Sequence, residues 1–134
     1  MIRIETIDHV QILAPTGSEA DIRAFYGGIL GLEEIEKPPE LRPRGGVWYR
    51  VGDGRILLHI GTEASPPDAG RRHFAFRVAD VPEACRHLEA QGVRTGEAPQ
   101  VAGMPRFYGY DPFGNQIEFM NYADPQTELH HAHS

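Results

Sequence analysis

Short stretches of alternating apolar and polar residues recur along the chain, and turn-forming residues separate them. Alternation with a period of two is typical of β-strands that bury one face. Together with runs rich in β-branched and aromatic residues, it predicts strands at eight places: Ile7–Leu13, Leu32–Glu36, Val47–Val51, Ile56–Ile60, His73–Val78, Val93–Thr95, Arg106–Tyr110 and Gln116–Met120.

Two other stretches repeat their apolar residues with the helical period, and each follows the first strand of its half. The first, Ser18–Gly27, opens with a serine followed three residues later by Asp21, in the manner of a capping box, and ends at a pair of glycines. The second, Pro82–Gln91, has a proline in its first turn and Gly92 as its stop.

The element order β-α-β-β-β therefore occurs twice, on either side of a polar linker at Gly61–Gly70. Each half is roughly 60 residues long, which is marginal for an independent domain. We expect one α+β domain spanning residues 1–134, built from two βαβββ modules at about 5–62 and about 71–122. A polar tail follows at residues 123–134.

The stretch Asp111–Asn121 joins a turn, D-P-F-G-N, to a strand, Q-I-E-F-M. Proline fixes its own φ, Gly114 can supply a positive φ, and the aspartate can bond neighbouring backbone groups. Glu118 lies within this apolar strand, where a buried carboxylate requires a partner. That partner is an arginine or a metal ion, unless the side chain reaches water.

Composition and charge favour a single globular domain and argue against nucleic-acid and membrane partners. The chain has 134 residues, of which 40% are hydrophobic and 24% charged, as is typical of a single globular domain. Its formal net charge of -6 argues against nucleic acid or an anionic membrane as a partner. Cys85 is the only cysteine, so an internal disulfide is impossible. The N-terminus lacks the apolar run of a signal peptide, and no stretch reaches the ~18 apolar residues of a membrane span, so we expect a cytoplasmic protein.

Aligning the two halves places His9 beside His73, each near the start of the first strand of its module. The same alignment, with one extra residue in the second turn, pairs Leu57 with Glu118. Two imidazoles and one carboxylate suit borderline divalent metals and leave coordination positions open for water or substrate. We therefore expect His9, His73 and Glu118 to bind one divalent ion, which is zinc, manganese, iron, nickel or cobalt.

The motifs D-H-V-Q-I, R-R-H-F-A-F-R-V and D-P-F-G-N-Q-I-E-F, in this order on a duplicated frame, resemble the vicinal oxygen chelate superfamily. This group includes glyoxalase I, extradiol dioxygenases, fosfomycin-resistance transferases and bleomycin-binding proteins. The resemblance covers about residues 5–122. It implies a curved, half-open barrel around a metal, usually in a homodimer, with His9, His73 and Glu118 as the ligands.

One position departs from the pattern of glyoxalase I. The resemblance implies a glutamate at the symmetry mate of Glu118, where the alignment places Leu57, which cannot bind a metal. His59 follows two residues later on the same strand face, about 6.6 Å along, and either faces the substrate or binds the metal directly. The loop Glu97–Pro105 carries no lysine or arginine, unlike the cationic phosphonate-binding loop of fosfomycin transferases.

Tyr108, His59 and Gln11 are the candidates for proton transfer or substrate orientation. Gln11 shares a strand face with His9 and otherwise forms a polar pocket wall. Tyr108 otherwise packs as a core aromatic with its hydroxyl at the rim.

Two functions fit this constellation. The first is a metal-dependent lyase, isomerase or dioxygenase whose small substrate chelates the ion through two oxygens. The alternative is a protein that sequesters a small aromatic or antibiotic-like ligand in the same groove.

Overall fold

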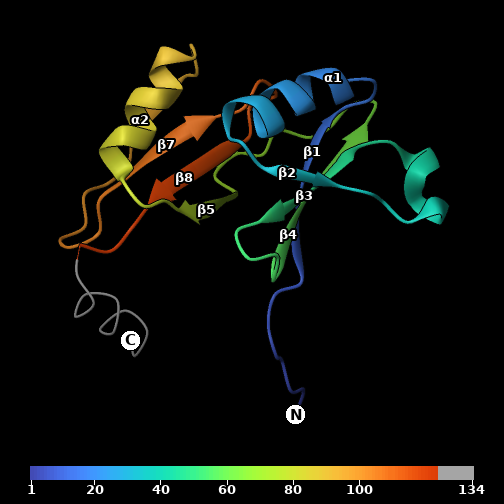
Figure 1. The fold of residues 1–134 in the computed structure, drawn as a ribbon, viewed down its shortest axis with the longest axis horizontal. Helices are drawn as coiled ribbons and strands as arrows, with labels where there is room; N and C mark the ends of the chain where they lie inside the picture. Colours follow the sequence, from blue (N-terminus) through green and yellow to red (C-terminus); the bar gives the residue numbers. More distant parts are fainter. Residues whose placement is uncertain (124–134) are drawn as a thin grey trace. The chain divides into compact units, whose positions relative to one another are not determined.

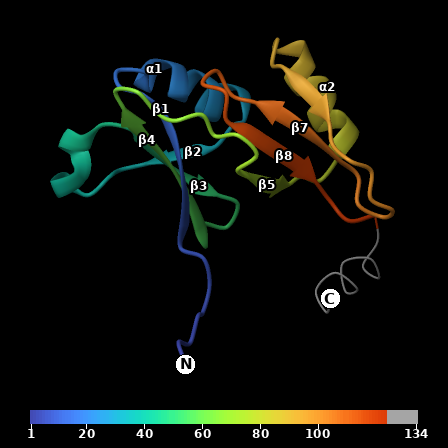
Figure 2. The same ribbon diagram turned by 180° about the vertical axis from the view of Figure 1, so that it is seen from behind.

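The computed structural model describes residues 1–123, so the predicted tail, apart from its first residue, lies outside the described residues. The chain divides into two compact units, Met1–Asp68 and the remainder from Ala69 onward (Figures 1 and 2). None of the helices in residues 1–123 has the length and apolarity needed to cross a membrane.

The first unit contains a four-stranded mixed sheet in the order β1-β4-β3-β2, in which β1 and β4 are parallel and the other neighbours are antiparallel. Its elements are β1 His9–Pro15, α1 Glu19–Ile22, the π-helix η1 Arg23–Ile29, β2 Glu33–Ile35, the 3-10 helix η2 Pro39–Arg44, β3 Val47–Val51 and β4 Ile56–Glu63.

The second unit repeats this topology in the order β5-β8-β7-β6, with β5 and β8 parallel. Its elements are β5 His73–Arg77, α2 Val81–Ala90, β6 Thr95–Glu97, β7 Arg106–Tyr110 and β8 Gln116–Met120. Helix α2 packs on β6, β7 and β8, and Figure 1 shows it beside β7 and β8. The predicted α+β class with two βαβββ modules is confirmed.

Alternation along the strands of the first unit separates a buried face from a polar one. The buried side chains come from the helical segment and from strands β3 and β4: Ile22, Phe25, Tyr26, Val47, Tyr49, Leu58 and Ile60. The rings of Tyr26 and Tyr49 lie 6.0 Å apart and connect η1 to β3. The opposite face carries His9, Gln11, Trp48 and His59, which leaves these polar and aromatic groups available for chemistry.

The Tyr49 hydroxyl is buried and has no hydrogen-bond partner among the described residues, and burial raises the pKa of Tyr49 to about 12. A buried polar group without a partner costs about 1–3 kcal/mol. We therefore expect Tyr49→Phe to preserve the free energy of unfolding or to raise it by about 1 kcal/mol, as measured by urea denaturation. A loss of more than about 1 kcal/mol would show that the hydroxyl has a favourable partner.

The first helix ends later than the sequence predicts. The π-helix runs through both glycines, and the Leu30 N–H donates to the Phe25 carbonyl five residues back, at 2.9 Å. The predicted stop at the glycine pair is therefore wrong. The capping box is also wrong, because the Ser18 hydroxyl donates to the Pro15 carbonyl and makes no cap hydrogen bond.

The D-P-F-G-N turn forms as predicted and fixes the start of β8. One carboxylate oxygen of Asp111 accepts from the backbone N–H groups of Phe113 and Asn115, at 2.9 and 2.8 Å. The other accepts from the Asn115 side-chain amide at 2.8 Å. Gly114 has φ +90°, a conformation that glycine adopts readily. This local network sets which face of β8 presents Glu118.

Candidate functional site

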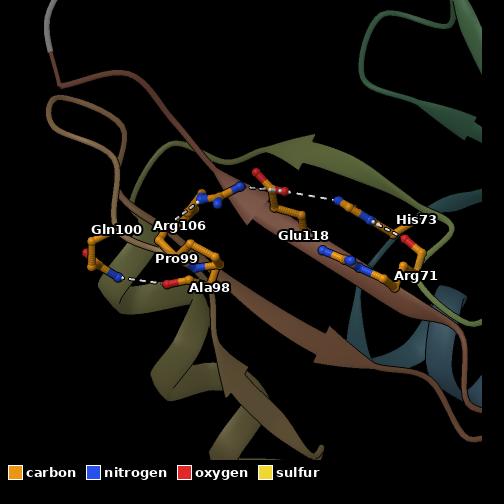
Figure 3. A network of polar contacts seen from close by, with 7 residues as sticks. All are labelled: Arg71, His73, Ala98, Pro99, Gln100, Arg106 and Glu118. Carbon is orange, nitrogen blue, oxygen red and sulfur yellow. Dashed lines mark hydrogen bonds and ion pairs between the residues drawn. The ribbon is translucent and has the colours of Figure 1, made fainter.

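In the second unit, strand register gathers a polar cluster on one sheet face around Glu118. Ala75 of β5 and Tyr108 of β7 lie opposite Glu118 of β8. His73 Nε2 and Arg106 Nη1 each lie 3.2 Å from Glu118 Oε1 (Figure 3). The Glu118 side chain is 7% exposed, so this carboxylate depends on those two contacts.

The orientation of His73 is fixed by its other nitrogen. Nδ1 lies 3.0 Å from the carbonyl oxygen of Arg71, so it donates a hydrogen there (Figure 3). Nε2 then faces a carboxylate oxygen, and two electron-rich atoms at 3.2 Å require a proton or a metal ion between them. Metal-binding histidines typically donate their other ring N–H to a carbonyl or a carboxylate, as His73 does.

The separation of these two atoms also fits a shared ion. Ligand atoms about 2.1 Å from a metal, at angles of about 90–110°, lie roughly 3.0–3.4 Å from each other. His73 Nε2 and Glu118 Oε1, 3.2 Å apart, fall in this range. The donor set, one imidazole nitrogen and one carboxylate oxygen, is one that borderline divalent metals accept.

Arg106 is a site residue that the sequence pattern does not single out. Its Nε donates to the Pro99 carbonyl at 2.9 Å while Nη1 contacts Glu118 (Figure 3). The arginine partner considered for Glu118 from sequence is thus present. One sequence feature indicates Arg106 as a partner of Glu118. It lies two residues from Tyr108 on the same strand face, within diagonal reach of the strand that carries Glu118.

Tyr108 lies next to this cluster, as predicted. Its ring meets the His73 ring edge-on, with centroids 5.6 Å apart. The residue is half-buried, and its role as a hydrogen-bond donor to the substrate stays a prediction.

In the first unit, three rings form a stack. The His59 ring lies between the Trp48 ring, at 3.7 Å and 2° between planes, and the His9 ring, at 4.1 Å and 15°. His59 is 5% exposed, and its Nε2 has no hydrogen-bond partner among the described residues. Burial, and then the neighbouring His9, lower the pKa of His59 to about 4. His59 is therefore neutral at neutral pH and keeps a nitrogen lone pair.

His9 itself is exposed, and its Nδ1 lies 2.9 Å from Oδ2 of Asp8. A carboxylate beside one ring nitrogen favours the tautomer that leaves Nε2 free to bind a metal. His9 belongs to the first unit and the His73–Glu118 pair to the second. Across residues 1–123, no three His, Cys, Asp or Glu side chains are grouped as a metal site, and the three-ligand hypothesis stays a prediction.

The strand registers show which positions of the two modules are equivalent. His9 lies opposite Leu57 of β4, and His73 lies opposite Gln116 of β8. Leu57 therefore corresponds to Gln116, and its predicted pairing with Glu118 is wrong.

The counterpart of Glu118 is His59. Each lies two residues beyond the residue that faces the first-strand histidine of its module. Each also lies opposite an aromatic residue of the preceding strand, Trp48 or Tyr108. The sequence alignment failed because the extra residue lies in the first hairpin and not in the second. The counterpart of Glu118 in the first module is therefore a histidine, which can bind a metal, and not Leu57, which cannot.

Gln11 lies on the His9 face, beside a cleft of about 190 Å³ in the first unit. The sheet contributes Gln11, Leu13 and Trp48 to its lining, and the segment before β3 contributes Lys37, Leu41 and Arg44. The prediction that Gln11 forms a polar pocket wall agrees with this placement, and a substrate contact by its amide remains a prediction.

The single thiol is not part of this chemistry. Burial, and then the Glu89 carboxylate 3.0 Å from its sulfur, raise the pKa of Cys85 to about 11. The reactive thiolate is therefore scarce at neutral pH. We expect iodoacetamide at pH 8 to modify the folded protein at least about 100-fold more slowly than the urea-denatured protein. Equal rates, followed by mass spectrometry, would contradict this assignment.

Comparison with known proteins identifies the family. The family model described as the Glyoxalase/Bleomycin resistance protein/Dioxygenase superfamily matches residues 6–119. This chain belongs to that superfamily. The resemblance inferred from the three sequence motifs is confirmed.

Solved structures of the superfamily are similar to this chain. A protein from Bacillus anthracis assigned to the glyoxalase family shares 44% identity and a TM-score of 0.85, with 91% of this chain and 98% of that chain covered. A glyoxalase/dioxygenase from Nostoc punctiforme shares 25% identity and a TM-score of 0.74, over 89% and 92%. The fosfomycin resistance protein FosX from Listeria monocytogenes, at 21% identity and a TM-score of 0.74 over 96% and 99%, shares the fold. No protein of curated function matches the chain in sequence.

Proposed function

We propose that this superfamily member is a divalent-metal-dependent enzyme that acts on a small substrate chelating the ion through two oxygens. The observation that carries the proposal is the contact of His73 Nε2 with Glu118 Oε1 at 3.2 Å, with His73 Nδ1 held by a backbone carbonyl. His9 is the third ligand in this proposal. His59, neutral and with no hydrogen-bond partner for its Nε2 within residues 1–123, is suited to be a further ligand.

When bound, the ion supplies Lewis-acid stabilisation of negative charge on the substrate oxygens. The chain's own groups have separate tasks. Tyr108 donates a hydrogen bond to the substrate or holds a proton at its hydroxyl, beside His73. Gln11 orients the substrate through its side-chain amide. His59, if it does not bind the ion, accepts a proton at Nε2.

The metal content of the purified protein tests this proposal. The protein is purified without added metal, and the tail residues His130, His131 and His133 are replaced by alanine, because tail imidazoles also bind metal. Elemental analysis should find about one divalent ion per chain. The ion should be lost in His73→Ala and kept in His87→Ala, a change at an exposed histidine of α2. Equal metal content in the two variants contradicts the proposal.

A second function is favoured by one specific observation. Arg106 neutralises Glu118 through the chain's own contacts, so the fold does not require an ion at this carboxylate. This supports a protein that sequesters a small aromatic or antibiotic-like ligand. Protein free of metal at every stage of purification, but able to bind such a ligand, supports sequestration over catalysis.

We also propose a homodimer, as the superfamily resemblance implies. Sedimentation at working concentration should give about twice the mass of one chain, and a monomer contradicts it.

A further inference from the structure

The cleft of the first unit lies on the same sheet face as His9 and His59. Its lining residues come from the sheet, from the segment that precedes β3, and from the end of β4: Gln11, Leu13, Lys37, Leu41, Arg44, Gly45, Trp48, Gly61, Thr62 and Glu63. At about 190 Å³ it is smaller than a whole drug-sized site and suits one end of a small molecule.

The segment beside the cleft is cationic within an acidic chain. Residues 37–46 contain three basic residues and one acidic residue, a net charge of 3 − 1 = +2, against -6 for the chain. Arg42 pairs with Glu36 at 3.6 Å. Arg44 lines the cleft, and within residues 1–123 its guanidinium makes no hydrogen bond or ion pair.

Lys37 adds a second cation to the cleft lining. Its ammonium donates to the Gly45 carbonyl, which fixes the side chain and leaves two N–H groups for a ligand. Glu63, at the end of β4, is the one carboxylate of the lining. Two cations against one carboxylate favour an anionic group in the cleft.

Trp48 supplies an aromatic wall. One face of its ring is covered by His59 at 3.7 Å, which holds the ring in place, and the side chain also lines the cleft. Leu13 and Leu41 add apolar surface. Aromatic and aliphatic lining with a few charged groups is typical of sites for planar, charged small molecules.

Strand β1 connects the cleft to His9, the proposed metal-binding residue, and its length limits the size of the small molecule that could reach both. His9, Gln11 and Leu13 share one face of β1, and a strand rises about 3.3 Å per residue. Gln11 is therefore about 7 Å and Leu13 about 13 Å from His9 along the strand.

We propose that this cleft binds the anionic end of the substrate, through Arg44 and Lys37, with a planar part of the same molecule against Trp48. The substrate is then a small planar acid, a carboxylate or a phosphonate, which extends from His9 to the stretch of β1 that lines the cleft, about 7–13 Å along the strand. The chelating end rests on the proposed function, whereas binding of the anionic end needs no metal.

Trp48 is the only tryptophan of the chain, so its fluorescence reports on binding beside its ring, and the Arg44 variant assigns the signal to this cleft. Chelator-treated protein is titrated at constant ionic strength with 3-phenylpropionate, phenylphosphonate and the neutral 3-phenylpropionamide. At least one of the two acids should give a saturable change, with the amide at least about 10-fold weaker. Arg44→Gln and Lys37→Gln should each weaken acid binding about 10-fold, as expected for one charge-assisted hydrogen bond.

Arg55→Gln is the matched control, because Arg55 is an exposed arginine of the β3–β4 hairpin, paired with Asp53. It should leave acid binding unchanged. The proposal is overturned if neither acid binds, if the amide binds as tightly as the acids, or if Arg44→Gln binds like the wild type. Because the protein is metal-free throughout, these results do not depend on whether the metal proposal stands.

Discussion

Glu118→Gln should weaken divalent-metal binding by at least about 100-fold, because it removes the charged oxygen that faces His73 at 3.2 Å. The amide keeps the size of the side chain and can still accept from Arg106, so the sheet should persist. Calorimetric titration of metal-depleted protein with Zn²⁺ or Mn²⁺ measures the loss. The tail histidines are replaced by alanine in every variant.

Glu89→Gln is the matched control, because it makes the same change at an exposed glutamate of α2, and it should bind metal like the wild type. Wild-type affinity in Glu118→Gln would remove Glu118 from the proposed ligands.

Arg106→Met gives the opposite test. It removes the guanidinium that contacts Glu118, a cation that a metal ion must displace or tolerate. Metal affinity should then rise about 10-fold, and a fall would show that Arg106 orients the carboxylate for the ion.

Gly46→Ala should reduce the free energy of unfolding by at least about 3 kcal/mol, equivalent to a fall of about 10 °C in Tm. Gly46 has φ +89°, and a Cβ added there would lie 2.3 Å from the backbone oxygen of Ile60. Its N–H donates to Glu19 Oε2 at 2.9 Å, and this bond is the first cause of the lowered pKa of Glu19. Thermal denaturation followed by circular dichroism measures the effect.

Gly17→Ala separates the backbone strain of a positive φ from the steric contact with Ile60. Gly17 has a similar φ of +84°, but a Cβ added there meets no atom within 4 Å. It should cost only the backbone strain, about 1–2 kcal/mol. Equal losses in the two variants would show that the contact with Ile60 is relieved at little cost. Since Gly46 precedes Trp48 by two residues, the larger loss should be accompanied by altered Trp48 fluorescence.

Local chemistry explains which elements could be predicted from the sequence. Strands β7 and β8 have the predicted bounds, because the turn between them is specified by Asp111, Gly114 and Asn115 through contacts within five residues. The predicted end of the first helix is wrong. Glycine propensity predicts a stop at the glycine pair, whereas the π-helical hydrogen bond from the Leu30 N–H to the Phe25 carbonyl continues the helix.

The site was harder to predict because it depends on register between strands distant in sequence. Motif order predicts that His73 and Glu118, 45 residues apart, lie together, and their side chains are 3.2 Å apart, whereas their role as metal ligands stays a prediction. The equivalence of His59 with Glu118 depends on which hairpin carries the extra residue. The resulting two-residue shift keeps the same strand face, so alternation cannot detect it without the ladder of backbone bonds. The Arg106 contact likewise depends on the β7–β8 register.

The most direct measurement is anomalous diffraction from a crystal of the protein with its tail histidines replaced, recorded above and below the absorption edge of the metal found by elemental analysis. The account predicts one anomalous peak per chain, about 2.0–2.2 Å from His73 Nε2, a Glu118 carboxylate oxygen and a His9 ring nitrogen. A crystal of metal-supplemented protein with no peak at Glu118, and with Arg106 still on that carboxylate, would contradict it.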